Sequence, residues 1–97
     1  MNFMSAPPYV VSTLALLKKA FPEGVSDGEY MPLLVLLYPY LSDRNLAEVV
    51  SMFTGRMYGG VLNDVYGVGI LKLPSEIVEP VRARLVAAGF EEWSKED

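Results

Sequence analysis

"YMPLLVLLYPYL", residues 30–41, contains no charged side chain and is the most apolar stretch of the chain. Within it, residues 33–37 are apolar on every side, and a helix without a polar face must be covered all round. This segment is therefore expected to be the central helix of the fold. Ser26 and Glu29 have the spacing of a capping box, which places the helix start just before the stretch. Pro32 leaves a second possibility, a helix that begins at this proline after a separate turn, and Pro39 ends the segment in either case.

The segments on both sides of this stretch have the periodicity of helices. Residues 8–21 carry one apolar stripe with spacings of four, three and four, Pro8 suits a first helical turn, and Pro22 follows the stripe. After the central stretch, Ser42 is a good N-cap, and Gly55 falls where a left-handed C-cap belongs. The apolar residues between them recur at i, i+3, i+4 and i+7, which predicts a helix.

Two further helices are predicted with weaker signals. Asn63 or Asp64 is expected to cap a short fourth helix, with the preceding glycines 59–60 as a turn and the glycines at 67 and 69 as close helix contacts. Ser75 is expected to open the last helix and Gly89 to cap it. Pro80 lies inside that helix and predicts either a kink or a later start near the proline.

The predicted fold is all-α, a compact bundle of about five short helices in one domain, residues 1–97. The expected ordered core covers about residues 8–93, and the acidic tail "EEWSKED" is expected to fray. A chain of 97 residues leaves no room for a second core. The 52% of apolar residues is typical of a chain that folds, and no strand pattern competes with the helices.

The composition also indicates the cellular location of the protein and the classes of partner that it is expected to bind. There is no cysteine, so neither a disulfide nor a thiolate metal site is expected. The longest apolar run has eleven residues and is broken by two prolines, which predicts no membrane insertion and a cytoplasmic protein. The net charge of −4 disfavours nucleic acid, because Lys and Arg drive that binding.

The glycine-rich stretch "TGRMYGGVLNDVYGVGILK", residues 54–72, raises the question of a nucleotide site. A phosphate-binding loop requires lysine and a hydroxyl after its last glycine, but Val61 and Leu62 stand there. The dinucleotide pattern fails as well, because Lys72 occupies the place of the third glycine. We therefore expect no nucleotide cofactor.

Catalytic and metal-binding residues are not expected either. The chain lacks histidine and cysteine, the commonest general base and the best nucleophile. Glu76 and Glu79 form a possible carboxylate pair, but their place in a first helical turn explains them through the helix dipole. The sequence predicts no enzyme, no cofactor and no metal site.

The strongest candidate for binding is Arg56-Met57-Tyr58, which lies between two glycine turns of the predicted fold. Arg, Met and Tyr are enriched at protein interfaces, so these residues form a possible partner-binding anchor. The alternative is that Met57 and Tyr58 fill the core as a loop plug, because methionine commonly fills gaps in cores.

Five segments in the same order resemble a family of small uncharacterised proteins from mycobacteria and related actinobacteria, over about residues 10–93. They are "FPEGV" (21–25), "YMPLLVLL" (30–37), "LSDRNLAEVV" (41–50), "LNDVYGVGI" (62–70) and "VRARLVAAGF" (81–90). The resemblance implies a compact bundle of five helices and an intracellular bacterial origin. It implies no activity, ligand or partner, and Pro80 departs from the family pattern.

These observations together favour a non-catalytic protein-interaction module or adaptor with an unknown protein partner. The alternative is a carrier of a small apolar ligand held between helices, which the surplus of Leu, Val and Met permits. A helix-turn-helix that binds nucleic acid is the least favoured function because of the acidic charge. The expected oligomeric state is a monomer.

Overall fold

The computed structural model describes residues 7–95 and contains, in that range, helices and no strand, which confirms the predicted all-α class. Six α-helices and two short 3-10 helices follow one another: α1 (Pro8–Ala20), α2 (Asp27–Leu37), η2 (Tyr38–Tyr40), α3 (Asp43–Thr54), α4 (Tyr58–Tyr66), η3 (Val68–Ile70), α5 (Ser75–Ala87) and α6 (Phe90–Ser94). The radius of gyration is 12.8 Å, close to the value of about 13 Å for a compact chain of this length.

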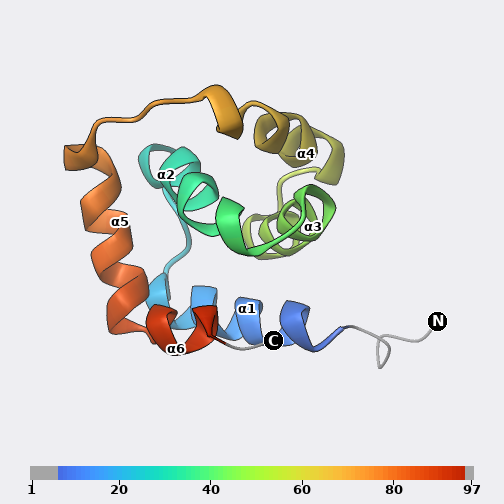
Figure 1. The fold of residues 1–97 in the computed structure, drawn as a ribbon. Helices are drawn as coiled ribbons and strands as arrows, with labels where there is room; N and C mark the ends of the chain where they lie inside the picture. The colour runs from blue at the N-terminus through green and yellow to red at the C-terminus, as the bar shows by residue number, and fades with distance from the viewer. Residues whose placement is uncertain (1–6, 96–97) are drawn as a thin grey trace.

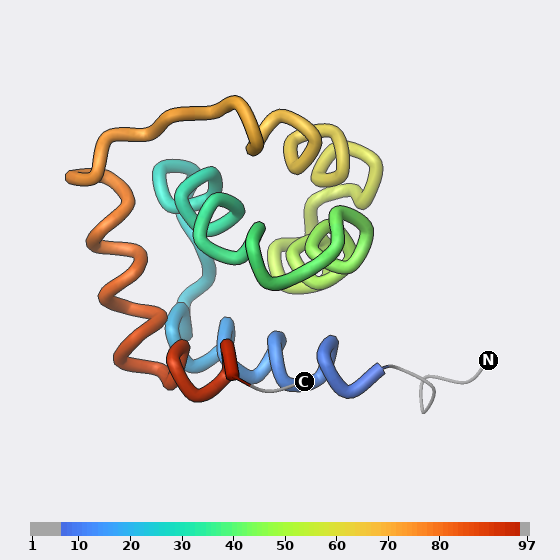
Figure 2. Tube along the Cα trace, in the orientation of Figure 1, coloured from blue at the N-terminus to red at the C-terminus, as the bar shows by residue number. Residues whose placement is uncertain are grey.

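Helix α2 lies in the middle of the molecule, and the other helices form a frame around it (Figure 1). Helices α1 and α5 cover it on two sides, and α3 and α4 pack against each other on a third. The connection from η3 to α5 crosses the open end of the frame, and α6 returns to lie beside α1 (Figure 2).

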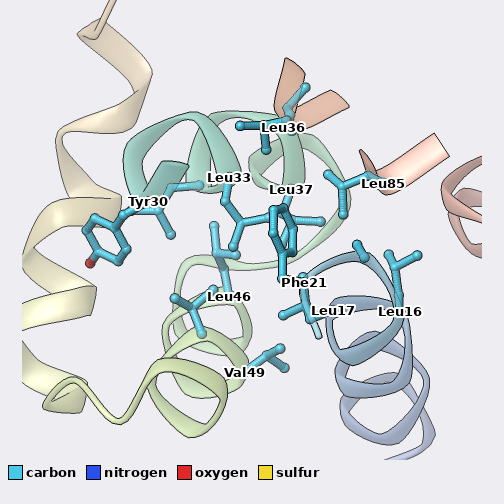
Figure 3. Close-up of a cluster of buried hydrophobic side chains, with 14 of the residues drawn as sticks. Leu16, Leu17, Phe21, Tyr30, Leu33, Leu36, Leu37, Leu46, Val49 and Leu85 are labelled. Carbon is cyan, nitrogen blue, oxygen red and sulfur yellow. The ribbon is translucent and has the colours of Figure 1, made fainter. Parts of the chain in front are cut away.

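The leucines of α2 are the centre of the hydrophobic core, as the sequence predicts. Leu33, Leu34 and Leu37 are completely buried. Figure 3 shows Leu33 and Leu37 beside Phe21 at the end of α1 and above Leu46 of α3. An apolar helix without a polar face is therefore covered by several neighbours at once.

The capping box sets the start of α2, and Pro32 does not. The Ser26 amide donates a hydrogen bond to Glu29 Oε1 over 3.0 Å, and the helix continues through Pro32 to Leu37. The alternative start at Pro32 is wrong. Pro39 lies in the 3-10 turn that ends the segment, as expected.

Helix α3 has the predicted caps at both ends. The Asn45 amide donates to Ser42 Oγ over 3.1 Å, and Gly55 adopts the left-handed conformation with φ 78°. The buried face of α3, which includes Val49 and Val50, packs on α1 and α4.

Helix α4 begins six or seven residues earlier than predicted, because its N-cap is Met57 and not Asn63 or Asp64. It starts at Tyr58, so Gly59 and Gly60 belong to its first turn and form no separate turn. Burial of Val61 and Val65 against α3 offsets the low helix propensity of the two glycines.

The residues predicted to cap α4 have other roles. Asn63 and Asp64 lie inside the helix, and Asp64 accepts a hydrogen bond from Tyr30. Gly67 and Gly69 follow the helix, and only Gly69 lies near another element, because a Cβ on it would be 3.5 Å from the Tyr38 hydroxyl.

Helix α5 begins at Ser75, as predicted, and continues through Pro80. The alternative start near Pro80 is wrong. Pro80 and Glu76, whose carbonyl loses its amide partner to the proline, are both exposed, so this part of the helix faces solvent and not the core. Gly89, with φ 105°, terminates the helix in the left-handed conformation expected there.

A sixth helix occupies part of the tail that was expected to fray. Helix α6 covers Phe90–Ser94 and is attached by two side chains. Phe90 is buried, and the Trp93 indole donates to Thr13 Oγ1 of α1 over 3.0 Å. These tertiary contacts stabilise a helix that is too short to form alone.

Candidate protein-binding site

Arg56 belongs to a network within the chain. Its guanidinium lies 3.1 Å from Asp27 Oδ1 and 3.8 Å from the centre of the Tyr30 ring. The Tyr30 hydroxyl in turn donates to Asp64 Oδ2 over 2.7 Å. Burial raises the pKa of Tyr30 far above its usual value, and the hydrogen bond to the Asp64 carboxylate adds to this. Arg56 therefore joins the α3–α4 connection to α2.

Met57 and Tyr58 are exposed and do not fill the core. Met57 has 84% of its surface exposed and Tyr58 has 42%, so the loop-plug interpretation is wrong. Met57 has an extended backbone at the N-cap of α4, and Tyr58 is the first residue of that helix. The predicted anchor is thus divided between an arginine engaged within the chain and two apolar side chains that face solvent.

Tyr58 begins a row of large side chains that runs along α4 into η3. Tyr58, Leu62 and Tyr66 are spaced four residues apart on α4, and four-residue spacing forms a ridge on a helix surface. Ile70 follows at the same spacing in the 3-10 helix η3. Tyr66 is 61% exposed, Ile70 is 88% exposed, and Leu62 is half-buried at the edge of the core. We call these four residues the α4 ridge.

A row of small residues lies next to the ridge. Gly59, Asn63 and Gly67 are also spaced four residues apart, each one position after a ridge residue, and all three are exposed. A Cβ added at Gly59 would meet nothing within 4 Å, and at Gly67 only the carbonyl of Asp64. This row, which we call the α4 groove, carries the exposed Asn63 side chain between its two glycines, and no described residue covers it.

The fold does not require glycine in the α4 groove. Neither Gly59 nor Gly67 has a positive φ. In a helix, glycine costs up to about 1 kcal/mol relative to alanine, and Gly59 and Gly60 are both helical. The glycines in the first turn of α4 thus reduce helix stability without serving a contact within the described chain.

Ridge and groove form a surface without charge. Asp64 is the only charged residue between Met57 and Leu71, although charged residues make up 21% of the chain. Asp64 is half-buried, and its carboxylate accepts a hydrogen bond from the Tyr30 hydroxyl. An exposed helix face normally carries charged side chains, whereas the core of a protein interface is depleted of them.

The sequence alone predicts only the first part of this surface, Met57 and Tyr58. Tyr66 and Ile70 were not predicted as site residues, because the fourth helix was expected to begin at Asn63 or Asp64. The available signal is the four-residue spacing of Tyr58, Leu62 and Tyr66, which places these side chains on one face only if a single helix contains all three.

A second feature is a cleft of about 440 Å³ at the opposite end of α3, between α1, the start of α3 and α6. Its lining residues carry no formal charge at neutral pH: Pro8, Tyr9, Ser12, Tyr40, Leu41, Ser42, Asn45, Trp93 and Ser94. Three of them are aromatic, three serines and Asn45 supply hydroxyl and amide groups, and the remaining two are apolar.

Contacts within the chain fix the aromatic walls of the cleft. The Tyr40 ring meets the rings of Phe90 and Trp93 edge to face, with centroids 5.6 Å away in both cases. Tyr9 donates its hydroxyl proton to Asn45 Oδ1. Burial raises the pKa of Tyr9 above its usual value, and the nearby Glu48 carboxylate adds to the effect, so Tyr9 stays a neutral donor at physiological pH.

Residues 7–95 contain no group of three His, Cys, Asp or Glu that could hold a metal ion. Of the carboxylate pair considered above, Glu79 forms an ion pair with Arg82 over 3.1 Å, and Glu76 lies exposed in the first turn of α5.

No family model, curated protein or solved structure significantly matches this chain. The resemblance to the small actinobacterial family therefore stays a prediction. Across the part of the chain that the structure covers, every helix is too short or too polar to span a membrane.

Proposed function

We propose that this chain is a non-catalytic protein-interaction module that binds its partner through the α4 ridge and groove. The observation that carries the proposal is the uncharged, solvent-exposed surface from Met57 to Ile70. It extends the anchor expected at Met57 and Tyr58 by Tyr66 and Ile70, and it leaves Arg56 outside the contact surface.

The large apolar side chains of this surface are unfavourably exposed to water, and burial by a partner removes that free-energy cost. Burying a large apolar side chain is worth about 1.5–3 kcal/mol, and Met57, Tyr66 and Ile70 are each more than half exposed in the isolated chain. Aromatic residues and methionine in a surface free of charge are typical of the central part of an interface.

The surface is also held rigidly before any partner arrives. Val61 and Val65 are buried against α3, on the side of α4 away from solvent. The hydrogen bond from Tyr30 to Asp64 joins the middle of α4 to α2, and the Arg56 guanidinium packs over the Tyr30 ring at 3.8 Å from its centre. A surface fixed in this way loses little conformational entropy on binding.

Photocross-linking from defined positions in the producing cell tests the proposal. A benzophenone amino acid replaces Tyr66 in one variant and Val86 in another, because Val86 is an exposed apolar residue of α5, 42% exposed, outside the α4 surface. We expect a discrete protein adduct from position 66 and none from position 86. Equal labelling from both positions, or no adduct from either, would refute the proposal.

The cleft between α1, α3 and α6 favours a second candidate function, the binding of a small uncharged ligand. Its volume lies within the range of small-molecule sites, and it combines aromatic walls with the polar groups of Asn45 and Ser42. Trp93 is the only tryptophan of the chain and lines the cleft, so its fluorescence reports directly on an occupant. We expect a native-host lipid or metabolite extract to change that emission if this function is correct, and unchanged emission at every fraction would exclude it.

Other aspects of the proposal rest on composition. The acidic net charge of −4 supports a protein partner over nucleic acid. We propose a cytoplasmic location, which the absence of cysteine supports because no disulfide depends on an oxidising compartment.

A further inference from the structure

We infer that the cleft between α1, the start of α3 and α6 binds a neutral sugar, which packs one face of its ring on the aromatic walls and pairs its hydroxyl groups with Tyr9, Ser42 and Asn45. This inference rests on the second candidate function, the binding of a small uncharged ligand, and it names the class of that ligand. It does not depend on the α4 surface, because none of the described lining residues belongs to α4.

The aromatic walls of the cleft supply a surface on which a sugar ring can pack. Tyr40 and Trp93 both line the cleft, and their rings meet edge to face with centroids 5.6 Å apart. Phe90 stacks on Trp93 with an angle of 17° between the ring planes, which holds the indole in place. The face of an aromatic ring is electron-rich and attracts the slightly positive C–H groups that cover one side of a pyranose. The walls are therefore fixed in advance for a ring that is apolar on one side.

The polar groups of the cleft include both hydrogen-bond acceptors and donors. Tyr9 donates its hydroxyl proton to Asn45 Oδ1, so the phenol oxygen keeps only its capacity to accept. Ser12 and Ser94 donate their protons to backbone carbonyls of their own helices, and their oxygens are left as acceptors too. The donors are the Asn45 side-chain amide, whose Nδ2 makes no hydrogen bond within residues 7–95, and the Ser42 hydroxyl, which accepts from the Asn45 backbone and keeps its own proton.

A hydroxyl-rich ligand fits this mixture of groups better than a lipid or an anion does. Each sugar hydroxyl can both donate and accept, so it can pair with either kind of group in the cleft. An apolar ligand would cover the Asn45 amide and leave its donors without a partner, which costs free energy. An anion would meet acceptor oxygens and no cationic side chain in the described lining, with the Glu48 carboxylate close enough to act on Tyr9.

The size of the cleft predicts a weakly bound monosaccharide. Its volume of about 440 Å³ lies in the lower part of the range for small-molecule sites. A monosaccharide has only about a dozen non-hydrogen atoms, and neutral ligands of that size gain limited free energy per atom. We therefore expect a dissociation constant on the order of 1 mM, so the ligand must be added at concentrations well above this value.

Titration of the ¹⁵N-labelled full chain with glucose, galactose, mannose and N-acetylglucosamine, each to about 50 mM, tests the inference by NMR. We expect at least one of these sugars to give saturable shifts of the Asn45 side-chain amide and the Trp93 indole signals.

Asn45→Asp is the test variant, because it keeps an acceptor for the Tyr9 hydroxyl and removes the two amide donors. Asn63→Asp is the matched control, since it makes the same change of charge at an exposed position of α4 outside the cleft. We expect Asn45→Asp to weaken sugar binding at least tenfold with an unchanged Tm, because a carboxylate in the first turn of α3 suits the helix dipole. Asn63→Asp is expected to bind as the wild type does.

The outcomes separate the class of ligand from the existence of the site. The sugar is overturned if none of the four gives saturable shifts at Asn45 and Trp93, or if Asn45→Asp binds as tightly as the wild type. Saturable shifts with uridine or with 1-octanol, and with no sugar, overturn it as well. If native-host extract then still changes the Trp93 emission, the second candidate function stands and only the class of ligand is wrong. If the extract leaves that emission unchanged, both are wrong.

Discussion

Replacing Leu37 with alanine is the most informative perturbation of the fold, because Leu37 is fully buried in the centre of the core (Figure 3). The substitution removes three carbon atoms, each worth about 0.8 kcal/mol of transfer free energy. The cavity left behind adds about 1–2 kcal/mol, since helices on several sides cannot all move inward. We therefore expect Leu37→Ala to lower the free energy of unfolding by about 3–4 kcal/mol.

Urea denaturation followed by far-UV circular dichroism measures this loss. Because small domains have total stabilities of about 5–15 kcal/mol, the midpoint should shift by roughly 2 M urea or the variant should be partly unfolded in buffer. Leu71→Ala is the matched control, as Leu71 is 37% exposed in the connection after η3, and a loss below about 1 kcal/mol is expected there. A cost below about 1 kcal/mol at Leu37 would refute α2 as the central helix.

Three further predictions concern polar contacts. Ser26 and then Arg84 lower the pKa of Glu29, so its contribution to stability is present above the ordinary glutamate pKa, about 4.3, and is lost as pH falls through the folded-state value. The stability gap between wild type and Glu29→Gln should therefore close in acid, and a gap that widens below pH 4 would contradict this. Thr13→Val removes the acceptor of the Trp93 indole and should cost about 1–2 kcal/mol in melts followed by tryptophan fluorescence, whereas an unchanged midpoint would show that α6 is attached otherwise. Tyr30→Phe should cost about 1.5 kcal/mol and speed amide exchange in α4, and unaltered exchange there would contradict its role as a tether.

Local signals in the sequence were sufficient for four of the helices. Ser26 with Glu29, Ser42 with Gly55, and Gly89 act through contacts with their immediate neighbours, so their residue types alone indicate where helices start and stop. Pro32 and Pro80 were harder to interpret, since a proline in the second turn is tolerated when the packing of the whole helix outweighs one lost hydrogen bond.

The start of α4 and the existence of α6 depend on tertiary contacts that a local pattern does not contain. Two glycines in a first turn argue against a helix by propensity, and the burial of Val61 and Val65 on α3 reverses the outcome. Likewise α6 has only five residues and exists because Phe90 and Trp93 pack on Tyr40 and Trp93 donates a hydrogen bond to Thr13.

The error at α4 also concealed most of the candidate site. With the helix expected to begin at Asn63 or Asp64, Tyr58 and Tyr66 did not share a helix, and Gly59 was interpreted as part of a turn. Once a single helix contains all three, the ridge and the groove follow from the spacing alone. The engagement of Arg56 with Asp27 and Tyr30 had no sequence signal, because those partners are more than 25 positions away.

The most direct test of the α4 surface as the partner-binding site is the ¹H–¹⁵N NMR spectrum of the labelled chain, recorded before and after addition of unlabelled soluble protein from the producing cell. Every amide reports on its own surroundings, so the spectra locate the contact as well as detect it. We expect shifts or line broadening confined to residues 57–70 and absent from the cleft residues Tyr9, Asn45 and Trp93. Spectra that stay unchanged, or changes centred on the cleft, would contradict the account.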